Sequence, residues 1–276
     1  MDKPTIGIWV DDPANLIRTP KYWDAAKEHG IECAALMMES IKEGFDPKYT
    51  ADTLETVFAL AEERDIELAL TCWFDPSLKY IAQFEEKIGA LLAASGAVEL
   101  ENDAEANWKP ARLEGFPDMA RAAKAATESL KRVQEKYDVR TALTTFPGHR
   151  ELGDSAQLSG EVDRVFGQAY SVRHRTTGNI AWDSRYGPGG MQKYTLERTL
   201  TIPGVGTSSG PLVCVGLAAY DQTFPGHTPQ EAMQVAYDMA CKYSPVEIRY
   251  WSSKWVFGIK KNDYASKFLK KLAKGQ

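Results

Sequence analysis

Short apolar runs alternate with amphipathic stretches along almost the whole chain. The first run, TIGIWV, covers residues 5–10, and the last, EIRYWSS, covers residues 247–253. β-branched and aromatic residues are frequent in both, as is typical of strands. A comparable run begins at Ala97, and others cover residues 31–38, 66–74, 139–146, 166–172 and 211–220. The pattern therefore predicts eight strands.

Most of these runs are followed by apolar residues at the 3.6-residue spacing of a helix with one buried face. Gly30 is suited to end the first helix, and Thr50 or Asp52 to cap the start of the second. The predicted helices cover residues 20–30, 50–65, 77–95, 117–137, 155–165, 190–200, 229–243 and 263–273.

This alternation favours parallel strands joined by helical crossovers, because the strands are apolar enough to be covered on both faces. Eight strand-helix units in 276 residues fit one (β/α)8 TIM-type barrel, a single α/β catalytic domain over residues 1–276. An open doubly wound sheet is the main alternative. Its first turn would be expected to carry a glycine-rich phosphate motif, whereas the turn WVDDPANLIRTP has no glycine.

Composition narrows the function classes. The chain is 43% hydrophobic and 26% charged, as in globular proteins, and its net charge of -5 gives no reason to expect nucleic-acid binding. No apolar run reaches the roughly 18 residues of a transmembrane span, and the first residues lack a secretory signal, so we expect synthesis in a cytoplasm. The four cysteines are scattered, and no HxH or HExxH spacing occurs. We therefore expect neither a metal nor another cofactor.

In a barrel of this type, active-site residues lie at the carboxyl ends of the strands. The predicted strand ends supply carboxylates and flat aromatic side chains. Sugar rings pack their C–H faces on such aromatics, and their hydroxyls bind carboxylates and amides, so a polysaccharide substrate is expected. The candidate substrate-binding residues are Trp9, Asp12, Trp73, Asp103, Gln168, Tyr170, Tyr220, Asp221 and Trp251.

The stretch AVELENDAEANW places carboxylates at alternate positions, so Glu99, Glu101 and Asp103 point to the same side of a strand. Crowded carboxylates have different proton affinities, which suits a pair acting as acid and base. We expect Glu101 to be the proton donor and the deeper Glu99 to orient it or to stabilise positive charge. The main alternatives for Glu99 and Glu101 are a solvent-facing edge strand and a salt-bridged barrel interior. Asp221 is a second possible partner for Glu101.

AVELEND also resembles the fourth-strand motif of glycoside hydrolase family 25, the barrel-fold muramidases of bacterial and phage lysins. The resemblance implies that Glu101 is the catalytic Glu, that Glu99 is its partner acid, and that Asp11 or Asp12 is a further active-site carboxylate. The residues YWSSKW after the last strand are similar too. By this resemblance the substrate is peptidoglycan, attacked after the enzyme is released to the cell wall.

The basic segment 263–273 is predicted to form the last barrel helix, with Phe268, Leu269 and Leu272 on its buried face. Its lysines offer a weak secondary contact with an anionic cell envelope. Two rival functions remain open at this point. One is a metal-dependent barrel enzyme that uses the same acids, and the other is a catalytically silent barrel that only binds carbohydrate.

Overall fold

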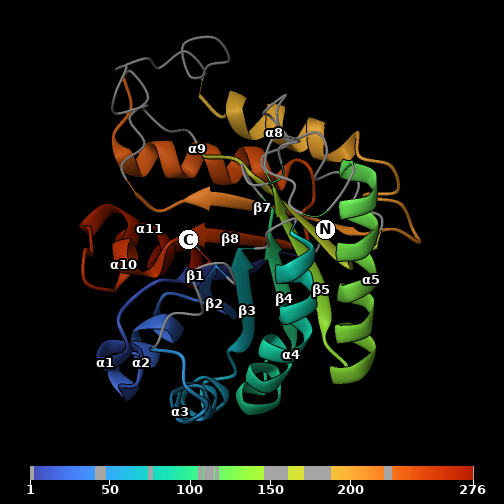
Figure 1. The fold of residues 1–276 in the computed structure, drawn as a ribbon. Coiled ribbons are helices and arrows are strands. Elements are labelled where there is room, and N and C mark those ends of the chain that lie inside the picture. Colours follow the sequence, from blue (N-terminus) through green and yellow to red (C-terminus); the bar gives the residue numbers. More distant parts are fainter. Residues whose placement is uncertain are drawn as a thin grey trace.

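The computed structural model describes residues 3–40, 48–73, 77–104, 108, 115, 118–145, 161–170, 188–220 and 226–275. Eight parallel strands form a closed barrel in the order β1 to β8, and helices surround it (Figure 1). The predicted (β/α)8 fold is therefore confirmed. The strands are β1 (Thr5–Val10), β2 (Cys33–Ser40), β3 (Glu67–Trp73), β4 (Glu99–Asp103), β5 (Arg140–Thr145), β6 (Arg164–Gln168), β7 (Leu212–Ala218) and β8 (Glu247–Trp251).

Several described helices begin with a side-chain capping hydrogen bond. Thr50 accepts a hydrogen bond from the backbone N–H of Thr53, and Thr228 and Glu231 form a reciprocal capping box. These caps fix where the connecting loops end. The helices are α1 (Ala14–Ile17), α2 (Pro20–Glu28), α3 (Ala51–Glu62), α4 (Leu78–Ser95), α5 (Met119–Tyr137), α8 (Gly190–Leu200), α9 (Pro229–Cys241), α10 (Ser253–Val256) and α11 (Asp263–Ala273).

Each strand has one face toward the helices and one toward the barrel axis. The outward residues, such as Ile8 and Leu100, belong to the large apolar layer between strands and helices. The interior holds a separate buried cluster, in which small side chains leave room for two large rings. Its buried members are Trp9, Cys33, Ala35, Ala69, Ala142, Phe166 and Cys214. Cys33, Cys72 and Cys214 are all buried.

Several predicted boundaries differ from the observed ones, and two of these differences have a clear physical reason. The predicted helix 155–165 runs into β6, which already begins at Arg164; residues 155–160 lie outside the described part of the chain. Charged residues made this segment look like a solvated helix, but Arg164 is stabilised in the barrel by ion pairs with Glu99 and Glu247. The last strand ends at Trp251 rather than at residue 253, because Ser253 begins α10.

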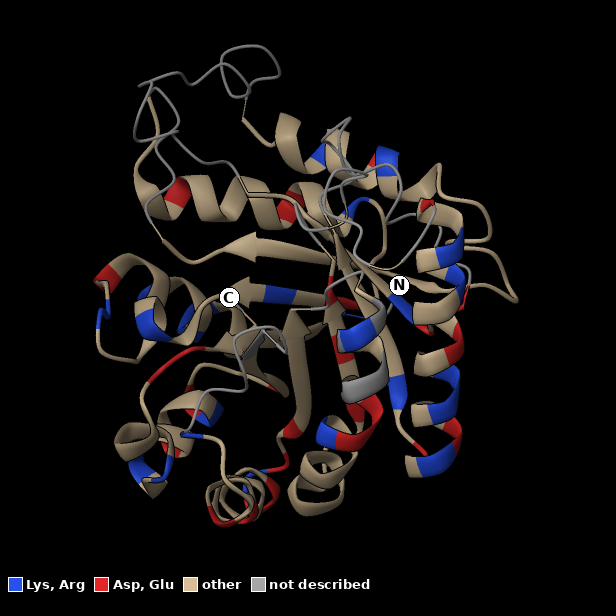
Figure 2. Ribbon diagram, viewed as in Figure 1, with Lys and Arg blue, Asp and Glu red and all other residues tan. Residues whose placement is uncertain are grey.

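The C-terminal helix α11 has the predicted bounds, and Phe268, Leu269 and Leu272 are buried beneath it. Acidic and basic residues alternate along outer helices such as α5, and charged residues also lie on strands of the barrel (Figure 2). Within the described ranges, no helix is both long and apolar enough to cross a membrane.

Candidate active site

A pocket of about 220 Å³ lies at the carboxyl end of the barrel. The rings of Trp9 and Trp251 lie 5.9 Å apart on one side of it. Gly216 makes room for Trp9, because a Cβ at this position would lie only 2.8 Å from the indole ring. The pocket combines apolar ring surface with polar groups, and its lining residues are Trp9, Met37, Thr71, Asp103, Thr144, Gln168, Tyr170 and Trp251.

Asp103 supplies the one carboxylate among the described residues that line this pocket. It is the last residue of β4, and its side chain is only partly buried. Gln168 at the end of β6 donates a hydrogen bond to its Oδ1 across 3.3 Å. Asp103 was expected to contact substrate, and its position in the lining is suited to that role.

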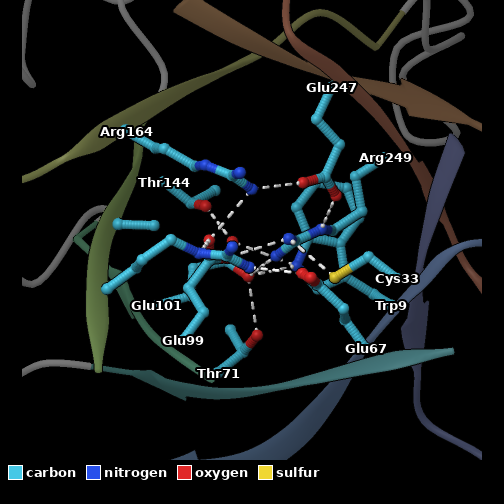
Figure 3. A network of polar contacts seen from close by, with 12 residues as sticks. Trp9, Cys33, Glu67, Thr71, Glu99, Glu101, Thr144, Arg164, Glu247 and Arg249 are labelled. Atoms are coloured by element: carbon cyan, nitrogen blue, oxygen red, sulfur yellow. Dashed lines mark hydrogen bonds and ion pairs between the residues drawn. The ribbon is translucent and has the colours of Figure 1, made fainter. Parts of the chain in front are cut away.

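Glu101 precedes Asp103 by two residues on β4, is fully buried and does not belong to the pocket lining. Figure 3 shows its polar contacts. The indole Nε1 of Trp9 donates to both of its carboxylate oxygens, at 3.1 and 3.0 Å. Thr71 donates to Oε2 at 2.7 Å, and Thr144 donates to Oε1. Arg249 donates to Oε2 at 2.5 Å. All four partners therefore stabilise a negative charge on Glu101.

These bonds also fix what the pocket floor can offer a ligand. A threonine hydroxyl has one hydrogen, and Thr71 and Thr144 both direct theirs at Glu101. Their remaining lone pairs can accept hydrogen bonds but the hydroxyls cannot donate at the same time. The floor is therefore suited to a ligand that brings donors, such as sugar hydroxyls or amide N–H groups.

Glu99 and Glu101 both point into the barrel, as their alternate spacing predicted, but they do not face each other directly. The guanidinium of Arg249 lies between them and donates to Glu101 through Nη1 and to Glu99 through Nη2, the latter at 2.9 Å. Arg249 also contacts the Phe166 ring, with Cζ 4.3 Å from the ring centroid. An arginine bridge therefore separates the two acids that were expected to act as a pair.

The ion pairs continue toward the amino end of the barrel. Glu99 pairs with Arg164 at 3.1 Å and with Arg140 at 3.6 Å, while Glu247 pairs with Arg164 at 2.9 Å and with Arg249 at 2.8 Å. Arg140 reaches Glu67 at 2.5 Å. We call these residues, together with Glu101, the charged interior (Figure 3). The salt-bridged alternative considered for Glu99 thus describes its surroundings.

The charged interior contains four carboxyl groups and three guanidiniums, so full ionisation leaves one net negative charge. Burial raises the pKa of Glu247 despite its arginine partners. Burial alone would lower the pKa of Arg249, but the carboxylates of Glu247 and Glu101 raise it well above its ordinary value. Arg249 therefore stays charged, and Glu247 takes up a proton more readily than an exposed glutamate does.

The two acids after β1 hold the loop after β8. Asp12 is fully buried and accepts hydrogen bonds from Tyr22 (3.0 Å), Ser253 (2.7 Å) and the backbone N–H of Ile259 (3.1 Å). Asp11 accepts from Ser252 at 2.7 Å and pairs with Lys254. Asp12 was expected to bind substrate; the structure instead uses its carboxylate to anchor a loop. Neither acid belongs to the pocket lining.

The remaining predicted residues are divided among several positions. Tyr170 lines the pocket, and Tyr220 contacts Tyr170 with ring centroids 6.3 Å apart. Trp73 ends β3 and is partly exposed without joining the lining. Asp221 lies outside the described residues. Sequence reasoning missed Thr71, Thr144 and the three arginines. The alternation of Glu247 and Arg249 in EIRYWSS, similar to that of Glu99 and Glu101, was a signal only that Arg249 points to the same side of its strand as Glu247.

The described residues contain no group of three or more His, Cys, Asp or Glu side chains arranged to hold a metal ion. The carboxylates inside the barrel are instead paired with arginines. No described cluster therefore favours the metal-dependent alternative.

No protein-family model and no curated protein sequence matches the chain. Several solved barrel structures do. A chitinase from Rhizomucor miehei matches with a TM-score of 0.62 and 12% identity, covering 99% of this chain and 100% of that one. A family 39 glycoside hydrolase from Bacteroides cellulosilyticus matches with a TM-score of 0.59 and 11% identity, covering 90% of this chain. This chain spans only 56% of the length of that enzyme.

Barrels with other chemistry are similar as well. Orotidine 5'-phosphate decarboxylase from Pyrococcus horikoshii matches with a TM-score of 0.52 and 10% identity, covering 99% of this chain and 100% of that one. At such low identity these likenesses establish the fold alone. The activity must therefore be inferred from the pocket.

Proposed function

We propose that this protein binds a carbohydrate in the pocket and hydrolyses a glycosidic bond there. The observation that carries the proposal is the composition of the lining, in which Trp9 and Trp251 face the same space as Asp103 and Gln168. Indole rings bind the C–H faces of sugars, and the carboxylate and amide bind hydroxyls. The acceptor lone pairs of Thr71 and Thr144 on the floor suit the same ligand.

We assign the proton-transfer role to Asp103 rather than to Glu101. Glycosidic cleavage needs a carboxyl group that reaches the bridging oxygen, and Asp103 belongs to the lining whereas Glu101 is fully buried and does not. Glu101 acts as a positioning residue, because its carboxylate holds Trp9, Thr71 and Thr144 in place. Glu99 stabilises the charged interior.

For the substrate, we propose a polysaccharide of N-acetylated sugars, with peptidoglycan as the first choice. The acceptors on the pocket floor suit the amide N–H of an N-acetyl group as well as hydroxyls. The resemblance of AVELEND to the muramidase motif points in the same direction. This specificity is separate from the proposed hydrolysis and is tested separately.

The test is to incubate the protein with purified peptidoglycan and with chitin oligomers and to identify the new reducing ends. We expect release from at least one substrate, and we expect Asp103→Asn to reduce it by about 100-fold or more, the usual loss for a general acid. Asp238→Asn on the exposed face of α9 is the matched control. Glu105, which follows Asp103 by two residues and lies outside the described part of the chain, is tested as Glu105→Gln.

The outcomes separate the assignments. Full activity in Asp103→Asn would take the acid role away from Asp103, and loss of activity only in Glu105→Gln would transfer it. No release from either glycan by the wild-type protein would contradict hydrolysis. A barrel that only binds carbohydrate is the second candidate, favoured by the single described carboxylate in the lining, since glycoside hydrolysis typically uses two.

A further inference from the structure

A line of aromatic rings leads from the pocket toward the loop after β8. Tyr170 lines the pocket, and its ring centroid lies 6.3 Å from that of Tyr220. The ring of Tyr220 lies 6.2 Å from that of Trp255 in α10. All three follow the carboxyl ends of consecutive strands, and all three are only partly buried. The aromatic surface therefore continues beyond the pocket.

Two lysines flank the outer end of this line. The Nζ atom of Lys254 lies 6.0 Å and that of Lys260 lies 5.4 Å from the centroid of the Trp255 ring. Lys254 is partly buried and pairs with Asp11, whereas Lys260 is exposed. The charge of Lys254 is thus matched by a carboxylate, whereas Lys260 places an exposed positive charge over a partly buried aromatic ring in a chain whose net charge is -5.

The loop that carries these residues is held in place from several sides. Asp12 binds it through Ser253 and Ile259, and a Cβ at Gly258 would come within 2.2 Å of the Asp12 carboxylate. Asn262 donates to the backbone oxygens of Trp255 at 2.8 Å and of Ala219 at 3.1 Å. A surface that is already ordered loses little conformational entropy when it binds a ligand.

We infer that Trp255 and Lys260, supported by Lys254, form a second sugar subsite that selects carboxylate-bearing glycans. The inference rests on the proposed function, because it adds an acidic sugar next to the one in the pocket. The Trp255 ring binds the C–H face of this sugar, and the Lys260 ammonium pairs with its carboxylate. An overall negative chain repels an anionic polymer, so the exposed positive charge of Lys260 has a specific use here.

The test compares two glycans that share a backbone and differ in charge. Peptide-free glycan strands from peptidoglycan carry a lactyl carboxylate on alternate sugars, and chitin oligomers of the same length are uncharged. Dissociation constants are measured by calorimetry at low and high ionic strength. At low ionic strength we expect the wild-type protein to prefer the acidic strands by about 3- to 5-fold, the value of one exposed ion pair.

Variants then test whether Trp255 and Lys260 cause the preference for acidic strands. Lys260→Gln should bring the ratio of the two affinities close to one, and Lys260→Glu should reverse it. Trp255→Ala should weaken both glycans. Lys267→Gln, at an exposed position of α11, is the matched control and should keep the wild-type ratio. Added salt should reduce the ratio, since exposed charges are screened.

The second subsite would be overturned if the wild-type protein bound both glycans equally, or if Lys260→Gln and Lys260→Glu left the ratio of affinities unchanged. Binding of chitin oligomers would still support carbohydrate binding in the pocket. Failure of the wild-type protein to bind either glycan would remove the proposed function and the subsite together. The two failures are therefore distinguishable.

Discussion

Acidic side chains lie at both ends of the barrel interior, but their surroundings differ. Toward the amino end, Glu99 and Glu247 are fully buried and paired with arginines. At the carboxyl end, Asp103 borders a pocket between aromatic rings. Glu101 lies between these regions, with Arg249 on one side and residues of the pocket floor on the other.

The comparison teaches that depth along a strand decides what a carboxylate can do. A buried acid needs a cation and several donors, and once these are in place it is no longer available to a substrate. An acid at the mouth keeps solvent and ligand access. On β4, Glu99 thus has a structural role, Glu101 a positioning role and Asp103 the candidate catalytic role.

The largest effect is expected from Arg249→Met. This change leaves the buried carboxylates of Glu99, Glu101 and Glu247 without their common partner, which should lower the free energy of unfolding by about 3–5 kcal/mol or more. Urea unfolding followed by circular dichroism measures the loss. The exposed pair of Arg132 and Glu85 gives the control, because Arg132→Met should cost at most about 1 kcal/mol.

If Arg249→Met does not fold, Arg249→Lys is the variant to measure in its place. A lysine keeps the charge but cannot bridge three carboxylates with the geometry of a guanidinium. An Arg249→Met protein as stable as the wild type would mean that the charged interior does not depend on this bridge.

Glu101→Gln and Asp103→Asn form a matched pair that tests depth directly. Glu101→Gln removes the charge that faces Arg249 and should lower the free energy of unfolding by about 2–3 kcal/mol. Asp103→Asn should change it by less than about 1 kcal/mol, because the side chain is only partly buried. Parallel denaturant titrations provide the comparison. Equal losses in the two variants would contradict the division of roles along β4.

A smaller effect is expected from Thr71→Val, which removes one donor to Glu101 with little change in shape. The loss of a hydrogen bond to a charged group should cost about 1–2 kcal/mol. The variant should also weaken glycan binding, since its hydroxyl lines the pocket floor. Thr56→Val, at a partly exposed position of α3 where the hydroxyl donates to the backbone oxygen of Asp52, controls for the general effect of the substitution. An unchanged free energy of unfolding in Thr71→Val would argue against a tightly held Glu101.

The subtlest prediction concerns pH. The pKa of Glu247 is raised above 4.5 in the folded protein, so folding favours its protonated form. Its contribution to stability is therefore fully present below the ordinary pKa and is lost as the pH rises through the raised one. Glu247→Gln should flatten the fall in stability over this window. Thermal unfolding of both proteins across acidic to neutral pH measures the difference, and parallel curves would refute the assignment.

Much of the fold was readable from the sequence because periodicity is a local property. The bounds of β1 and α11 were predicted correctly, since both have clear apolar patterns and punctuating residues on each side. The inward direction of Glu99 and Glu101 followed from alternation alone. The start of β6 was missed because Arg164 is stabilised only by residues from other strands.

The site was harder to predict because it depends on register between strands far apart in the sequence. Nothing local in VRTALTTF or EIRYWSS indicates that Arg249 reaches Glu101, 148 residues away. Asp12 and Asp103 were both expected to contact the substrate. They differ because Asp12 meets donors from α10 and the loop after it, whereas Asp103 meets the pocket.

The anchoring of Asp12 has a consequence for how the chain reaches its native state. Its partners Ser253 and Ile259 follow it by 241 and 247 residues, so a translating ribosome makes them long after Asp12. Ring closure between β1 and β8 waits for the same event. Contacts of such long sequence separation form slowly, and the nascent first strand must meanwhile stay shielded from aggregation.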